Sequence, residues 1–177
     1  MAEGDSIQRM ARRIAPALVG RPILAAAAPA PRSPLRGGPG PTVRALEGRV
    51  AERVETRGKH LLIHLDRGLA LHSHMGMNGS WRVESPGSPF GRPDRAAWLL
   101  LDLGDRRVAQ FGGPTLRLVP AAALERDRRL AALGPDLLAD GFDPEAAAAR
   151  LRASPEQLGT ALLDQRLLAG IGNIFKS

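Results

Sequence analysis

A series of short apolar segments separated by turn residues fills the middle of the chain, between residues 43 and 119. Turn signals such as Asp66-Arg67-Gly68 and Leu103-Gly104-Asp105 divide the series. Several short strands at this spacing predict an antiparallel sandwich or barrel. The segments that we expect to form strands are 43–56, 60–66, 69–74, 80–84, 97–103, 107–111 and 115–119.

An amphipathic helix and an irregular loop are predicted before these strands. The Pro-, Ala- and Gly-rich residues 27–42 predict a surface loop. Residues 5–18 predict the helix, which Gly20 ends. Asp5 is its expected N-cap, and its apolar face consists of Ile7, Met10, Ala11, Ile14 and Leu18.

The pattern becomes helical from residue 120 onward. Residues 120–131 predict a helix, and residues 143–152 predict another, with Asp143 as N-cap and Pro144 at the first position. Ser154-Pro155-Glu156 opens a further helix that runs to about Leu163. The sequence therefore predicts a sandwich-like domain followed by an all-helical one, with a boundary near residues 120–140.

Charge and cysteine content limit the possible partners. The net charge is +7, and residues 1–60 hold 11 basic and 5 acidic residues, or +6 of that total. This bias favours a polyanionic partner such as nucleic acid, and a solvated arginine-rich surface is the alternative. The absence of cysteine excludes disulfides and thiolate metal sites. The lack of cysteine fits a cytoplasmic protein. Because no apolar run approaches the roughly 20 residues of a membrane helix, we expect no membrane partner.

The N-terminus could carry chemistry. Ala2 is small, which favours removal of Met1 and leaves an α-amine with a pKa of about 7.7–8.0. Such an amine can attack a sugar C1′ or a carbonyl carbon to form a Schiff base, and Glu3 could transfer protons beside it. The alternative is an ordinary solvated N-terminus.

Two further motifs contain basic side chains near turns. Lys59, in Arg57-Gly58-Lys59-His60, is expected to project from a hairpin loop as a point charge or to belong to an ordinary surface turn. His72 and His74 alternate on one strand, which makes a poor metal pair and favours a core histidine or a phosphate contact. Met77 follows between Gly76 and Gly79, as a core residue or a wedge that enters a base stack.

The last motif is Gly170-Ile171-Gly172-Asn173. Closely spaced glycines that open a helix present backbone N–H groups to an anion, and the asparagine adds a side-chain donor. In a basic protein this arrangement favours a phosphate contact.

Taken together, these motifs resemble the formamidopyrimidine-DNA glycosylase/endonuclease VIII family, and most closely its actinobacterial endonuclease VIII-like branch. The matching pieces occur in family order and span the chain: Glu3-Gly4-Asp5, Arg57 through Leu62, His72 through Trp81 and Leu162 through Lys176. The resemblance implies an α+β fold. An N-terminal helix on a two-sheet antiparallel β-sandwich would occupy residues 1–120, and a helix–two-turns–helix DNA-binding domain, incomplete here, residues 121–177.

The resemblance also implies an activity. Members excise oxidised bases from double-stranded DNA, and the resemblance to the endonuclease VIII side suggests oxidised pyrimidines, with oxidised purines as the alternative. The damaged nucleotide is flipped out of the duplex. The N-terminal amine then forms a Schiff base with C1′, and β-elimination cleaves the strand. We expect a monomer that acts on damaged double-stranded DNA.

Roles carry over only where residues match. The implied catalytic residues are Ala2, Glu3 and Lys59, and His74 and Asn173 match phosphate ligands, to which the helix-opening argument adds Gly170 and Gly172. Met77 and Phe111 match the wedge residues that enter the duplex. No metal ligand is expected in this chain, because the family's zinc lies in a C-terminal finger that the chain lacks.

The sequence departs from the family pattern at several points. Ala2 replaces the usual proline, Ala109 and Gln110 stand where arginines often precede the wedge aromatic, and the chain stops at Ser177 inside the expected helix–two-turns–helix element. We therefore expect a C-terminally truncated member. The alternative function is a catalytically impaired DNA-binding fragment of such an enzyme.

Overall fold

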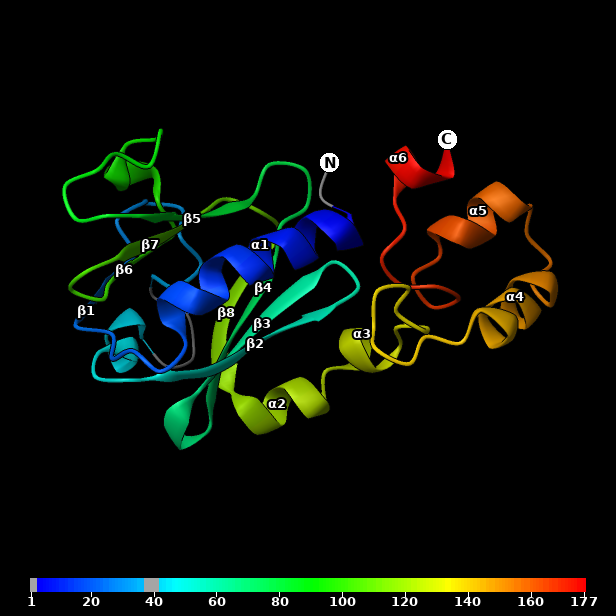
Figure 1. Cartoon of the computed structure of the whole chain (residues 1–177), viewed down its shortest axis with the longest axis horizontal. Coiled ribbons are helices and arrows are strands. Elements are labelled where there is room, and N and C mark those ends of the chain that lie inside the picture. The colour runs from blue at the N-terminus through cyan, green and yellow to red at the C-terminus, as the bar shows by residue number, and fades with distance from the viewer. Residues whose placement is uncertain (1–2, 37–41) are drawn as a thin grey trace.

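The computed structural model describes residues 3–36 and 42–177. Within them, helix α1 (Gly4–Leu18) packs beside two four-stranded antiparallel sheets, and short helices follow the last strand (Figure 1). This arrangement confirms the predicted α+β fold. None of the described helices combines the length and the apolarity that a membrane crossing requires.

The first sheet carries the histidines of the chain. Its strands are ordered β2-β3-β4-β8, with bounds Ala51–Arg57, His60–Leu65, Leu69–His74 and Thr115–Pro120. In its register His60 lies opposite His74, and His72 lies opposite Arg117. Because side chains directly opposite each other share a face, these four side chains lie on the same face of the sheet.

The second sheet has the order β1-β6-β7-β5. Its bounds are Ala25–Ala27 (β1), Leu99–Asp102 (β6), Arg107–Phe111 (β7) and Ser80–Glu84 (β5). Strand β1 was not predicted, because three consecutive alanines show no alternation of polar and apolar residues. The first part of the expected strand 43–56 is instead a 3₁₀ turn, Val43–Leu46, which buries Leu46 in the core.

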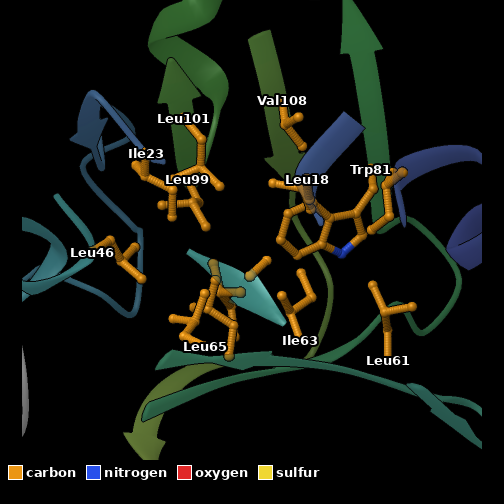
Figure 2. Close-up of a cluster of buried hydrophobic side chains, with 14 of the residues drawn as sticks. Leu18, Ile23, Leu46, Leu61, Ile63, Leu65, Trp81, Leu99, Leu101 and Val108 are labelled. Carbon is orange, nitrogen blue, oxygen red and sulfur yellow. The ribbon is translucent and has the colours of Figure 1, made fainter. Parts of the chain in front are cut away.

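The main hydrophobic core lies between the sheets. The face of β3 opposite to its histidines contributes Leu61, Ile63 and Leu65, and the second sheet contributes Trp81, Leu99, Leu101 and Val108 (Figure 2). Each of these side chains is almost fully buried. Since one face of β3 is committed to this core, its register is strongly fixed, and the polar residues must occupy the other face.

Helix α1 covers the core with the predicted face. Ile7, Ala11, Ile14 and Leu18 are buried, and Met10 packs partly against the same cluster. The N-cap is Glu3 rather than the predicted Asp5. Glu3 has an extended backbone, and its N–H donates to the Ser6 hydroxyl at 2.8 Å, so the helix begins earlier than the sequence indicated.

Short helices follow the strands. Two of them, α2 (Ala121–Glu125) and α3 (Arg128–Ala131), replace the single helix predicted over 120–131. Asp127 separates them because its carboxylate caps α3 by accepting from the Arg129 and Leu130 N–H groups. Helix α4 (Pro144–Arg152) has the predicted cap at Asp143, α5 (Leu158–Leu163) begins later than expected, and α6 spans Asn173–Lys176.

Candidate functional site

The first described residues contact the segment that precedes α6. The Gly4 N–H donates to the Gly170 carbonyl at 2.8 Å. The Glu3 carboxylate, buried to 1% exposure, accepts from the N–H groups of Gly172 (3.2 Å), Ile174 (2.6 Å) and Phe175 (3.4 Å). A carboxylate at the first turn of a helix satisfies N–H groups that have no partner within the helix.

This contact requires glycine at position 172. A Cβ atom there would lie 2.6 Å from Glu3 Oε1, a distance that real Cβ atoms do not tolerate. The same contact corrects the prediction that Gly170 and Gly172 donate to a DNA phosphate. Their N–H groups donate within the chain instead, to Gln165 Oε1 at 3.0 Å and to Glu3 Oε2 at 3.2 Å. The side chain of Asn173 is exposed at the start of α6.

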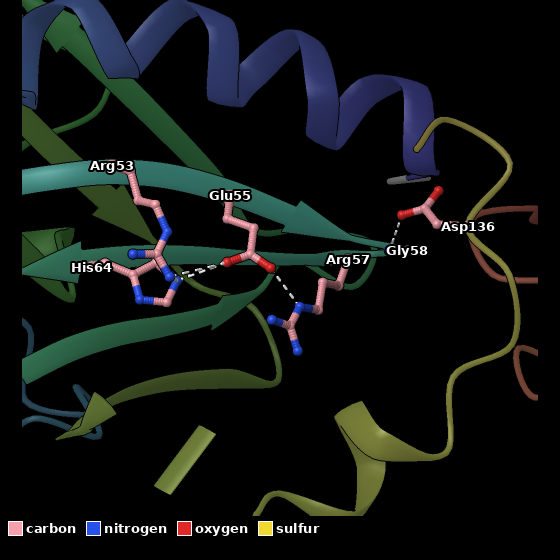
Figure 3. Close-up of polar contacts among 6 residues, drawn as sticks. All are labelled: Arg53, Glu55, Arg57, Gly58, His64 and Asp136. Carbon is pink, nitrogen blue, oxygen red and sulfur yellow. Dashed lines mark hydrogen bonds and ion pairs between the residues drawn. The ribbon is translucent and has the colours of Figure 1, made fainter. Parts of the chain in front are cut away.

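Lys59 lies in the tight turn between β2 and β3, which meets the helical part of the chain. Gly58 has a φ of +55°, and its N–H donates to Asp136 Oδ2 at 2.6 Å (Figure 3). Asp136 Oδ1 in turn accepts from the Leu138 N–H at 3.0 Å. The sequence did not single out Asp136, because the partner of its carboxylate lies 78 residues away.

Burial lowers the pKa of Lys59 below its ordinary value of 10.5, and the negative charge of Glu3 opposes this shift. The two predicted catalytic side chains therefore act on each other electrostatically. Ala2, the predicted nucleophile, lies outside the described residues.

A second group of polar contacts holds Arg57 along its own strand. Arg57 Nε donates to Glu55 Oε1 at 2.5 Å, and His64 Nε2 lies 2.8 Å from Glu55 Oε2 (Figure 3). Burial of the Glu55 carboxyl acts to raise its pKa, but the hydrogen bonds with Arg57 and His64 outweigh burial, and the pKa of Glu55 is lowered. The carboxylate thus stays charged, and the turn presents Lys59 next to an arginine that already has a partner.

His74 is the last residue of β4, and it lies near enough to Lys59 for the lysine charge to act on its ring. Burial lowers the pKa of His74, and the Lys59 charge lowers it further. His74 Nδ1 accepts from the Gly76 N–H at 3.1 Å. Its proton must then be on Nε2, which makes that nitrogen a hydrogen-bond donor.

The two predicted wedge residues have opposite environments. Met77 is 74% exposed on the turn that follows β4, as a wedge requires. Phe111 is only 1% exposed, packs edge-on against Phe90 at 6.0 Å between ring centroids, and is covered by the Arg92 guanidinium. The prediction that Phe111 enters a base stack is therefore wrong for this structure, because the ring is part of a small core under the 85–96 segment.

His60, for which the sequence suggested no role, and His72, expected to be a core histidine or a phosphate contact, also lie on this polar face. Their rings lie 5.0 Å apart between centroids, and the His60 ring lies 4.7 Å from that of His74. Alternation of histidines on paired strands was the signal that could have revealed the cluster. Although three histidines gather here, no group of three or more His, Cys, Asp or Glu side chains within residues 3–36 and 42–177 is arranged to hold a metal ion.

Comparison with known sequences places this site in a family context. Residues 1–114 match the family described as Formamidopyrimidine-DNA glycosylase N-terminal domain. The chain is 44% identical to a probable endonuclease 8 2 of Streptomyces coelicolor over 179 residues, covering 100% of this chain and 61% of that protein. It is 38% identical to endonuclease 8 2 of Mycobacterium bovis over 178 residues, covering 99% and 65%. The chain thus spans less than two thirds of the length of these relatives.

Comparison with solved structures supports the fold. Lactococcus lactis Fpg, in a complex with DNA that contains an abasic site, gives a TM-score of 0.80 at 24% identity, covering 98% of this chain and 64% of that one. The wild-type Fpg in a complex with DNA that contains N7-benzyl-Fapy-dG gives a TM-score of 0.77 at 23% identity, covering 96% and 62%. At this level of identity the likeness establishes the fold alone.

Proposed function

The chain belongs to the formamidopyrimidine-DNA glycosylase family through its N-terminal domain, and from this we propose that it is a DNA repair glycosylase that also cleaves abasic sites. The observation that carries the proposal is the position of Glu3 and Lys59. Glu3 is buried beside the N-terminus, and its charge acts on Lys59 across the β2–β3 turn. Schiff-base chemistry at a sugar requires a nucleophilic amine, here the α-amine of Ala2, and a carboxylate beside it that can transfer protons, here Glu3.

In the proposed reaction, removal of Met1 frees the α-amine of Ala2. The amine attacks C1′ of the damaged nucleotide, the bond from C1′ to the base breaks, and the base leaves with a proton. The C1′–O4′ bond of the sugar ring then breaks, O4′ takes up a proton, and C1′ and the amine nitrogen form the double bond of a Schiff base. Glu3 transfers protons during these steps. Removal of a C2′ proton then expels the 3′ phosphate by β-elimination, and water releases the enzyme.

Other residues would hold the DNA. We assign phosphate contacts to Lys59, His74 and Asn173, because each can donate a hydrogen bond from the same region as Glu3. The exposed Met77 would fill the space that the flipped nucleotide leaves in the duplex. The substrate would be double-stranded DNA with an oxidised base, pyrimidines being preferred, and the protein would act as a monomer.

The proposed boundary between the two domains lies at Pro120, where β8 ends. We propose that residues 1–120 form the catalytic domain and residues 121–177 belong to a helix–two-turns–helix DNA-binding domain. In this scheme Glu3 and Lys59 come from the first part and Asn173 from the second, so DNA would lie across the junction.

A second candidate function is DNA binding without catalysis. It is favoured by the Glu3 carboxylate, which already accepts from three backbone N–H groups, and by Ala2, which gives a primary amine where the family's proline gives a secondary one.

Borohydride trapping separates the two candidates. The chain is incubated with duplex DNA that contains an abasic site, and the reduced adduct is mapped by mass spectrometry. We expect a covalent link at the Ala2 nitrogen. An Ala2→Leu variant serves as control, because a large residue at this position retains Met1 and displaces the amine. Salt-dependent binding of the duplex without any adduct would overturn the catalytic proposal and support the second candidate.

A further inference from the structure

A cavity of 480 Å³ opens on the histidine face of the first sheet, beside α3. Its lining includes six histidine and charged side chains: His60, His72, Arg117, Asp127, Arg128 and Arg129. Three arginines against a single aspartate leave an excess of positive charge. Among the described residues, neither Arg128 nor Arg129 lies within ion-pair distance of a carboxylate.

Asp127 organises this lining. Its Oδ2 accepts from Arg117 Nη2 at 2.5 Å, and its Oδ1 accepts from the Arg129 N–H at 2.9 Å. The hydrogen bond from Arg117 outweighs burial and holds the pKa of Asp127 at about 2. Asp127 therefore stays charged, neutralises Arg117, and fixes the start of α3. The positive charge that remains available belongs to Arg128 and Arg129.

The hydrogen bond from Arg117 to His72 determines which ring nitrogen carries the proton in His72 and in His60. Arg117 Nη2 lies 2.6 Å from His72 Nδ1, and since a guanidinium can only donate, His72 Nδ1 accepts. A neutral His72 then carries its proton on Nε2, which lies 2.8 Å from His60 Nδ1 and donates to it. His60 in turn must carry its proton on Nε2.

Both rings stay neutral near pH 7. Burial lowers the pKa of His60 to about 3 and that of His72 to about 4, and the neighbouring His74 and Arg117 charges act in the same direction. A chain of hydrogen bonds thus runs from Asp127 through Arg117 and His72 to His60. It leaves the Nε2–H of His60, a residue that lines the cavity, as a hydrogen-bond donor.

The cavity adjoins the site described above. The His60 ring lies edge-on to His74 at 4.7 Å between centroids, and His74 is the proposed phosphate contact. We propose that the cavity is a second phosphate-binding site, which takes a phosphate group through His60 Nε2–H, Arg128 and Arg129. The phosphate is either a backbone phosphate next to the one at His74 or a free phosphate ester. The first source rests on the proposed function and the second does not.

The test combines two readouts in an Arg128→Gln/Arg129→Gln variant. One follows the ring ¹⁵N resonances of His60 and His72 by NMR while inorganic phosphate is added. The other measures the slope of log K against log salt for duplex DNA. The control is Arg150→Gln/Arg152→Gln, which removes the same charge from exposed positions at the end of α4.

We expect saturable phosphate-induced shifts at His60 that the cavity variant loses and the control keeps. If the phosphate comes from DNA, the cavity variant also lowers the steepness of the salt dependence by about 0.9 relative to the control, the value for one lost phosphate contact. If the cavity variant loses the NMR response but keeps the salt dependence of DNA binding, the site binds free phosphate. The same assignment holds if the NMR response is lost and the chain does not bind DNA at all.

The proposal is overturned if neither readout distinguishes the cavity variant from the control. A His60→Phe variant provides a second route to the same answer, since it keeps a ring but has no donor. A DNA or phosphate response that survives both substitutions would exclude the cavity. Failure of the proposed function is separable, because it appears as a missing borohydride adduct or as missing DNA binding, and neither of these affects the response to free phosphate.

Discussion

Glu3 connects the first residues of the chain to the turn that begins α6 through three hydrogen bonds from backbone N–H groups. A Glu3→Gln substitution would bring an NH₂ group toward these donors and leave part of them unsatisfied. We expect the free energy of unfolding to fall by about 1–3 kcal/mol. We also expect abasic-site trapping to fall at least about 100-fold, the usual effect of losing a general acid or base. Denaturant unfolding and trapping rates measure the two effects.

The matched control for this experiment is Glu52→Gln, which neutralises an exposed carboxylate on β2. It should leave both measurements unchanged. Trapping at the normal rate by a folded Glu3→Gln protein would contradict the assigned role.

Lys59 provides a pH-dependent test. Its pKa lies below 10.5 because the amine is partly buried, so it loses its charge at a lower pH than an exposed lysine. DNA affinity should therefore decrease on the alkaline side with a midpoint below that value. Lys59→Arg should abolish this decrease, because a guanidinium stays protonated. The control is Lys176→Arg at an exposed position, where the decrease should persist. Identical alkaline profiles in all three proteins would exclude Lys59 as the titrating contact.

His60 and His72 should make the fold sensitive to acid. Their pKa values in the folded protein are about 3 and 4, against 6.5 for the unfolded residues. In this window the unfolded state binds more protons, so the free energy of unfolding falls as the pH falls from 6.5 toward 4. The expected slope is about 1 kcal/mol per pH unit for each histidine. The groups that face these rings are His74, Arg117 and Asp127.

A His72→Gln variant should weaken this acid dependence, because the amide can still donate to His60 without titrating. Urea unfolding at a series of pH values measures it. Parallel curves for the variant and the original chain would mean that His72 does not stay neutral in the folded protein.

At the scale of the elements, the sequence predicted those with a strong local signal. The turn Asp66-Arg67-Gly68 separates β3 from β4, and the Asp143 cap begins α4. All three elements were predicted with nearly correct bounds. Strand β1 could not be predicted, because Ala25–Ala27 has no pattern and pairs only through its backbone with β6. The break between α2 and α3 was missed since Asp127 lies in an otherwise continuous helical pattern.

The α6 turn allows a test at this scale. In Gly172→Ala the new methyl group would lie 2.6 Å from Glu3 Oε1, which forces the carboxylate or the turn to move. We expect a loss of about 1–3 kcal/mol in unfolding free energy and a loss of protection from hydrogen exchange at the Ile174 N–H. The control is Gly159→Ala in α5, where the Cβ would meet only the mobile end of Lys176 at 3.2 Å. That change should be neutral or stabilising, since alanine favours a helix.

At the scale of the whole molecule, the candidate site depends on contacts that no local pattern contains. Glu3 and Gly172 are 169 residues apart, and the structure brings them together. The motifs around Glu3, Lys59, His74 and Asn173 each left a functional and an ordinary structural interpretation open, and only the family resemblance combined them into one site. It gave no indication that the Gly170 and Gly172 N–H groups are already used, or that Phe111 is covered, because both outcomes depend on which distant segments pack there.

Asp136 is the residue whose removal should separate the two parts of the chain most selectively. Its carboxylate accepts from the Gly58 N–H at 2.6 Å on the β2–β3 turn and from the Leu138 N–H at 3.0 Å on the helical side. Asp136→Ala removes both bonds, and losing a hydrogen bond to a charged group costs about 1.5–3 kcal/mol. The Lys59 turn should then move independently of the 169–172 segment. We expect faster hydrogen exchange at Gly58, unchanged exchange in α1, and DNA trapping that is reduced less than in Glu3→Gln. Asp140→Ala, at an exposed position nearby, is the control. If the Gly58 N–H keeps its protection in Asp136→Ala, this carboxylate does not hold the turn, and the packing of Ala169 against Gly58 must do so instead.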